Sequence, residues 1–142
     1  LRSEMHDTME SGAGIYRTED SLQATVTKIG ELRTRFTDLA LTDKSSVFNT
    51  ELIQALELDA MIETAHALAH CALVRTESRG SHQRLDHPKR DDKTFLKHSM
   101  AYFNANGDPR IEYLDVVITK SQPAERLYGG AGEKQSAAPA AE

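Results

Sequence analysis

Helical periodicity constrains the fold of this 142-residue chain more than any other feature of its sequence. Between residues 19 and 39, apolar side chains recur at spacings of three and four, which is the pattern of an amphipathic helix. These side chains are Leu22, Val26, Ile29, Leu32, Phe36 and Leu39. Thr18 is a suitable N-cap, and Glu19 and Asp20 follow it in the first turn, where negative charge is favourable.

A second, narrower stripe predicts a helix over residues 2–11. Leu1, Met5 and Met9 repeat every four residues, and we expect Gly12-Ala13-Gly14 to break the helix.

The longest expected helix covers residues 50–78, with Asn49 or Thr50 as its N-cap. Its apolar side is carried by Leu52, Ile53, Leu56, Met61, Ile62, Ala65, Leu68, Ala69, Ala72 and Leu73. Three helices with short connections predict a mainly α fold, an antiparallel three-helix bundle like a spectrin repeat, over residues 1–80.

After the bundle, residues 81–128 are expected to form an elbow loop, a short helical turn near Asp91-Asp92, and a β-hairpin. Apolar and polar residues alternate on both sides of Asn106-Gly107, which is a strong hairpin signal. Residues 129–142 hold Gly, Ala, Ser and charge without any period, so we expect a disordered tail.

A dense group of charges lies around Gly80, where we expect the longest helix to end. One interpretation is an exposed helix C-terminus, at which Arg side chains meet the last carbonyl groups. The other is a docking elbow that pairs with groups outside this chain. The candidate docking residues are Arg75, Glu77, Arg79, His82, Arg84 and Asp86.

Four further segments accompany this elbow in a familiar order. They are Gly14-Ile15-Tyr16-Arg17-Thr18, Ser45-Ser46-Val47-Phe48-Asn49-Thr50, Arg90-Asp91-Asp92-Lys93-Thr94-Phe95-Leu96-Lys97-His98 and Leu127-Tyr128-Gly129-Gly130. With the Arg79-Gly80-x-His82-x-Arg84-x-Asp86 elbow, the series resembles the C-terminal helical domain of the succinate dehydrogenase/fumarate reductase flavoprotein subunits. The resemblance covers about residues 1–130. Ser81 stands where Ala is more usual in the family.

The resemblance implies a structural and interaction domain of an FAD-dependent enzyme that interconverts fumarate and succinate. Its implied partners are the FAD-binding and capping domains of the same subunit, an iron–sulfur subunit and, as a further candidate, a flavinylation factor. Its implied location is cytoplasmic, at the inner membrane through partner subunits. In this setting Arg79, His82 and Arg84 would hold the helical domain against the flavin domain through charge-assisted hydrogen bonds.

No catalytic, flavin-attaching or cofactor-binding residue carries over to this chain, so we expect no cofactor and no activity of its own. The start at Leu1, without Met, indicates a fragment. L-aspartate oxidase and adenylylsulfate reductase carry similar helical domains and remain alternative parents. The segments Gly14-Ile15-Tyr16-Arg17 and Phe95-Leu96-Lys97-His98 look more like fumarate reductase.

Other chemistries find less support in the sequence. Glu63-x-x-His66, with His70 one turn further on, is half of a di-iron motif, but the sequence has no second Glu-x-x-His, so we expect no metal site. A free-standing helical metal or redox module that also uses Cys71 stays open as an alternative, as does a small acidic adaptor. Cys71 is the only cysteine, so no internal disulfide can form.

The charge of the chain excludes nucleic acid as a partner, and its hydropathy excludes direct membrane insertion. The formal net charge is −5, and acidic residues dilute the one basic patch. That patch is Arg75, Arg79, Arg84, Lys89 and Arg90. No apolar run approaches the length of a membrane span.

Overall fold

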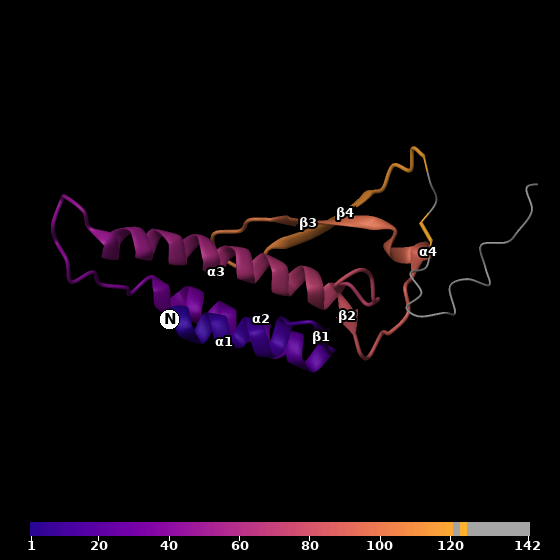
Figure 1. Ribbon diagram of the computed structural model, residues 1–142, viewed down its shortest axis with the longest axis horizontal. Helices are drawn as coiled ribbons and strands as arrows, with labels where there is room; N and C mark the ends of the chain where they lie inside the picture. Colours follow the sequence, from indigo (N-terminus) through magenta and orange to yellow (C-terminus); the bar gives the residue numbers. More distant parts are fainter. Residues whose placement is uncertain (121–122, 125–142) are drawn as a thin grey trace, which may run out of the picture.

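The computed structural model describes residues 1–120 and 123–124, and the mainly α class is confirmed within them (Figure 1). The elements are α1 (Arg2–Ala13), β1 (Tyr16–Arg17), α2 (Glu19–Phe36), α3 (Thr50–Val74), β2 (Gln83–Arg84), α4 (Asp92–Phe95), β3 (Lys97–Tyr102) and β4 (Arg110–Asp115). The expected tail, 129–142, and the segment Leu127-Tyr128-Gly129-Gly130 lie outside the described residues.

Both long helices begin at the residues that the sequence predicts. Thr18 and Ser21 form a reciprocal capping box at the start of α2, with each side chain bonded to the other's backbone N–H at 3.2 and 3.1 Å. The Asn49 side chain accepts from the Leu52 N–H at 2.8 Å at the start of α3. Caps of this kind each contribute about 1 kcal/mol to helix stability.

Both helices end earlier than predicted. Helix α2 stops at Phe36 rather than residue 39, and Leu39 is exposed. Helix α3 stops at Val74, because Arg75 takes an extended conformation at φ −89° and ψ 97°. The expectation that this helix reaches Gly80 is therefore wrong. Gly80, at φ 60°, lies in the tight turn that brings Arg79 and His82 together.

Helices α1, α2 and α3 pack side by side and share an apolar core (Figure 1). Its buried members are Met5, Ile29, Leu32, Leu58, Ile62 and Ala65. The helical spacing in α1 and α2 therefore identifies their core faces. In α3 it does so only in part, because Leu52, Ile53 and Leu56, all assigned to its packed side, are exposed. Helix α3 begins beyond the ends of α1 and α2, so its first turns have no helix to pack on.

Gly12 lies inside α1 rather than at the predicted break, and it allows α1 to approach α2 closely. A Cβ atom at Gly12 would lie 2.0 Å from the Thr25 hydroxyl oxygen and 3.1 Å from the Ser21 carbonyl oxygen. Thr25 is buried and bonded to the same Ser21 carbonyl at 2.8 Å, so it has little room to move.

We expect Gly12→Ala to lower the free energy of unfolding by about 2 kcal/mol, because the methyl group forces the two helices apart. Gly30→Ala is the matched control. A Cβ at that helical position meets nothing within 4 Å, so this change should stabilise the chain by about 0.5 kcal/mol. Urea unfolding of the two variants checks the pair, and equal effects of the two substitutions would contradict the close-packing account.

Two pairs of short strands accompany the helices. Strands β1 and β2 pair in parallel, with Tyr16 opposite Gln83 and Arg17 opposite Arg84. The sequence shows no sign of this short pairing. Strands β3 and β4 pair antiparallel from Lys97–Asp115 to Tyr102–Arg110 and lie along α3 (Figure 1). We call residues 103–109, which connect them, the β3–β4 loop.

Candidate functional site: a charge cluster after α3 and a cavity at the β3–β4 loop

Arg84 caps the C-terminal end of α3, although it lies further along the sequence, in β2. Its Nη1 atom donates to the carbonyl oxygens of Ala72, Leu73 and Arg75 at 3.3, 3.1 and 3.4 Å. Its other two nitrogens bond both carboxylate oxygens of Asp86 at 2.7 Å. The Arg84 residue is only 1% exposed. The last carbonyls of a helix lack partners within the helix, so Arg84 supplies the cap that ends α3 at Val74.

Glu77 is the buried anion at the centre of the cluster, with no exposed surface. Arg79 binds it through two nitrogens at 2.8 and 3.0 Å, Arg75 donates a third hydrogen bond, and the Asp91 N–H a fourth at 2.8 Å. Burial alone would raise the pKa of Glu77. The hydrogen bonds from Arg79, Asp91 and Arg75 outweigh burial, and the pKa lies below its usual value.

The two arginines that bind Glu77 also reach the elements that follow. Arg79 bonds Asp92 of α4 at 2.7 Å. Arg75 donates to the Phe95 carbonyl oxygen at 2.9 Å and to the Lys97 carbonyl oxygen, and its guanidinium lies 5.4 Å from the Phe95 ring centre. The cluster therefore ties the end of α3 to α4 and to the start of β3.

His82 links the cluster to the segment between α1 and α2. Its Nε2 lies 3.0 Å from the Arg75 carbonyl oxygen, which can only accept, so Nε2 carries the proton. Its Nδ1 then accepts from Arg17 Nη1 at 2.9 Å. Burial lowers the pKa of His82, and the nearby positive charges of Arg17, Arg84 and Arg75 lower it further, against the hydrogen bond to the Arg75 carbonyl.

All six predicted docking residues therefore belong to one network within the chain, in which Arg84 and Glu77 are fully covered. Docking to another domain stays a prediction for this segment. The interpretation as a helix end whose last carbonyl groups meet Arg side chains is confirmed by Arg84. The exposure that it included is wrong, because the helix ends at Val74 and the central charges are buried. The contribution of Arg17 cannot be predicted from the sequence, since no local pattern indicates that it meets His82.

The cluster makes stability fall on acidification, in two steps. Unfolded His82 takes up a proton near pH 6.5, whereas folded His82, with its lowered pKa, resists protonation, so stability is lost as the pH falls below about 6.5. Glu77, whose folded pKa is also lowered, adds a second loss below about pH 4.5. Urea unfolding at several pH values measures both steps. His82→Gln should remove part of the first step, and His98→Gln, at an exposed site on β3, should not.

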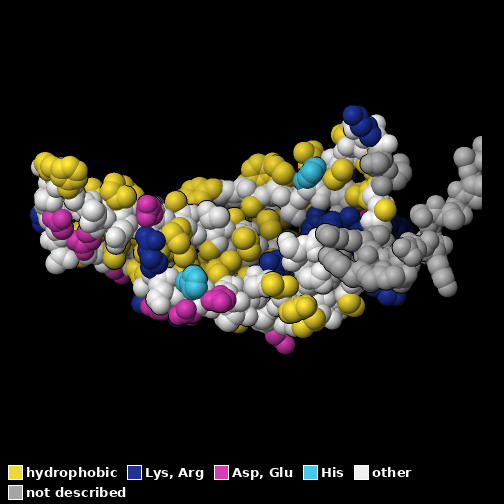
Figure 2. Space-filling view, viewed as in Figure 1, with side chains coloured by type: hydrophobic (Ala, Val, Ile, Leu, Met, Phe, Trp, Pro, Cys, Tyr) yellow, Lys and Arg dark blue, Asp and Glu magenta, His cyan; other side chains and the backbone are white. Residues whose placement is uncertain are grey.

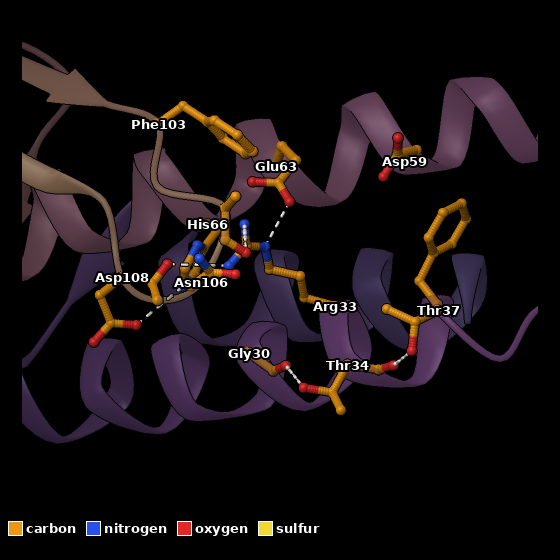
Figure 3. Close-up of a pocket in the computed structure, with 13 residues that line it drawn as sticks. Gly30, Arg33, Thr34, Thr37, Asp59, Glu63, His66, Phe103, Asn106 and Asp108 are labelled. Carbon is orange, nitrogen blue, oxygen red and sulfur yellow. Dashed lines mark hydrogen bonds and ion pairs between the residues drawn. The ribbon is translucent and has the colours of Figure 1, made fainter.

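A cavity of about 540 Å³ lies between α2, α3 and the β3–β4 loop (Figure 3). Arg33 of α2 spans it, bonding Glu63 of α3 at 2.5 Å and the loop carbonyl oxygens of Asn104 and Gly107 at 2.8 and 3.0 Å. Glu63, which the sequence places in a metal half-motif, is thus engaged by an arginine. His66 is buried beside it, and Asp108 points from the loop toward His66.

Cys71, a nucleophile candidate in the redox alternative, is half-buried. Burial raises the pKa of its thiol, against the nearby charge of Arg75, so the neutral, unreactive form predominates at neutral pH. Within the described part of the chain, none of the helices combines the length and apolarity that a membrane span requires.

The chain resembles known proteins along nearly its whole length. The family described as "Fumarate reductase flavoprotein C-term" matches residues 2–128. The fumarate reductase flavoprotein subunit of Haemophilus influenzae is 51% identical over 138 residues, covering 97% of this chain and 23% of the relative. The succinate dehydrogenase flavoprotein subunit of Rickettsia bellii is 35% identical, covering 90% of this chain and 23% of the relative.

A solved structure of a variant E. coli quinol fumarate reductase superposes with a TM-score of 0.86 at 50% identity, over 91% of this chain and 22% of that chain. The chain thus spans about a quarter of the length of the relatives that it matches. From the match over residues 2–128, this chain belongs to the fumarate reductase flavoprotein C-terminal family.

Proposed function

We propose that this chain is the C-terminal structural domain of a fumarate reductase flavoprotein subunit and braces the FAD-binding and capping domains of that subunit. The observation that carries the proposal is the 51% identity to a fumarate reductase subunit over 97% of the chain. Identity to a succinate dehydrogenase subunit is lower, at 35%. This difference supports fumarate reduction over the reverse reaction. FAD and the dicarboxylate would bind in the other domains of the subunit.

Partners and location follow from the same relationship. We propose an iron–sulfur subunit as electron donor to the flavin, and a position at the cytoplasmic face of the inner membrane through partner subunits. A flavinylation factor is a further proposed partner. For the fold, we propose that α1–α3 act as one antiparallel, spectrin-repeat-like bundle over residues 1–80, with 81–128 as elbow, α4 and β3–β4 hairpin. Their shared core supports this division.

The surface best suited to contact the flavin domain lies where α3 begins. We call it the α3 apolar surface, and its exposed residues are Val47, Phe48, Leu52, Ile53 and Leu56. Figure 2 shows hydrophobic side chains gathered at this end of the molecule. Clustered apolar side chains of this kind are typical of protein contacts.

Phe48 adds a second argument for contact at the α3 apolar surface. Its backbone adopts φ 54°, an uncommon conformation for a bulky residue, and its side chain is 94% exposed. Strained conformations persist where function or surroundings require them, which supports a contact at this ring.

We expect Ile53→Ser with Leu56→Ser, made in the full-length subunit, to reduce bound flavin and fumarate reduction several-fold, because polar side chains would weaken the contact. The same pair in the isolated chain should leave its melting temperature nearly unchanged, since both residues are exposed. Val117→Ser, at a residue that is 82% exposed elsewhere, is the control. Normal flavin content in the double variant would show that this surface contacts nothing essential.

A further inference from the structure

Three potential metal ligands converge at the edge of the cavity, from two separate parts of the chain. His66 and His70 are one turn apart on α3, and Asp108 lies in the β3–β4 loop. The two His Nε2 atoms lie 3.2 Å apart, and each lies 3.4 Å from the same Asp108 oxygen. Within residues 1–120 and 123–124, this is the only group of three His, Cys, Asp or Glu side chains whose ligand atoms lie this close together.

The triangle of ligand atoms has the size that a tetrahedral zinc ion requires. Zinc binds imidazole nitrogen and carboxylate oxygen at about 2.0–2.1 Å, which places neighbouring ligand atoms about 3.3 Å apart. The three observed separations are 3.2, 3.4 and 3.4 Å. The two imidazole rings are nearly perpendicular, at 89°, so the rings do not stack although their Nε2 atoms lie close together.

The two imidazoles lie in a largely buried position. The side chains of His66 and His70 are only 4% and 12% exposed. A metal ion satisfies both nitrogens and the carboxylate at once.

Asp108 is held in place without help from the histidines. Arg33 bonds the loop at the carbonyl oxygens of Asn104 and Gly107, and Asn104 bonds the Asp108 carbonyl at 3.2 Å. The Asp108 side chain is 75% exposed and borders the cavity, so a water molecule has access to a fourth coordination position.

We propose that His66, His70 and Asp108 bind one divalent transition metal ion of the Zn²⁺ type, which fastens the β3–β4 loop to α3. Two imidazoles select such ions over Mg²⁺ and Ca²⁺, which prefer oxygen ligands. Open tetrahedral coordination, with three protein ligands and a water, is a known zinc arrangement. The absence of a second Glu-x-x-His argues only against a di-iron centre. Asp108 is far from the histidines in the sequence, so no short motif includes it. Glu63 is hydrogen-bonded to Arg33 instead.

The test is zinc binding by the purified chain after treatment with a chelator. We expect one Zn²⁺ per chain by elemental analysis, and an affinity, measured against a chromophoric chelator, that falls about 100-fold or more in His66→Gln and His70→Gln and at least about 10-fold in Asp108→Asn. His6→Gln is the matched control, because exposed His6 lies 3.6 and 3.7 Å from the carboxylates of Asp7 and Glu10. Asp115→Asn, at an exposed residue of β4, is the second control.

Circular dichroism verifies that each variant is folded. The visible absorption of Co²⁺ bound to the unmodified chain gives a readout that needs no variant, since tetrahedral coordination by two nitrogens and two oxygens absorbs strongly. The proposal would be overturned if the chain bound no stoichiometric zinc or if all variants bound zinc equally. Loss of binding in the His6 control, or only octahedral Co²⁺ absorption, would overturn it as well.

Discussion

Arg84→Met is expected to lower the free energy of unfolding by about 3–5 kcal/mol, which is enough to unfold a marginal domain at physiological temperature. The substitution keeps the side-chain volume but leaves the Asp86 carboxylate without its two 2.7 Å hydrogen bonds. It also leaves the last carbonyls of α3 without a donor. Urea unfolding and far-ultraviolet circular dichroism of the purified chain measure the effect.

The matched control is Arg35→Met. Arg35 also bonds both carboxylate oxygens of its partner, Glu4, at 2.7 and 3.0 Å, but its side chain is 51% exposed. Exposed pairs contribute little, so the change should be far smaller than at Arg84. Arg84→Lys should fall between the two, since an ammonium cannot bind Asp86 with two nitrogens and cap α3 at the same time. Equal losses at Arg84 and Arg35 would contradict the role of burial.

Glu77→Gln is expected to have the second large effect and to lower the free energy of unfolding by about 3 kcal/mol. The neutral amide removes the carboxylate that Arg75 and Arg79 share, and brings an NH₂ group toward two guanidinium donors. The ends of α3, α4 and β3 meet at this residue, so we also expect faster amide hydrogen exchange in residues 92–102.

Glu4→Gln is its control, because Glu4 likewise binds an arginine with two oxygens but lies at the surface. A Glu77 variant as stable as the Glu4 variant would show that the buried carboxylate does not organise the cluster.

The parts of this fold that the sequence predicts are those set by local rules. Capping by Thr18 and Asn49 and the periodic stripes of α1 and α2 depend on neighbouring residues, and the structure confirms them. The end of α3 depends on Arg84, which arrives from further along the chain, so counting periodic residues overshoots Val74.

Long-range pairing also hides the candidate sites from the sequence. The charges after α3 are conspicuous, but only the fold shows that Glu77 and Arg84 are covered while Arg79 remains partly exposed. Exposure of Ile53 and Leu56 could not be predicted either. An apolar stripe has the same pattern whether it packs in its own domain or against another one.

The most direct test of a bracing role is to supply the domain in trans. A flavoprotein subunit that lacks the segment equivalent to this chain is expressed alone or with the 142-residue chain as a separate polypeptide. We expect the shortened subunit to retain little flavin and little fumarate reduction, and both to recover when the chain is supplied. Full flavin content and activity without the chain would contradict the account.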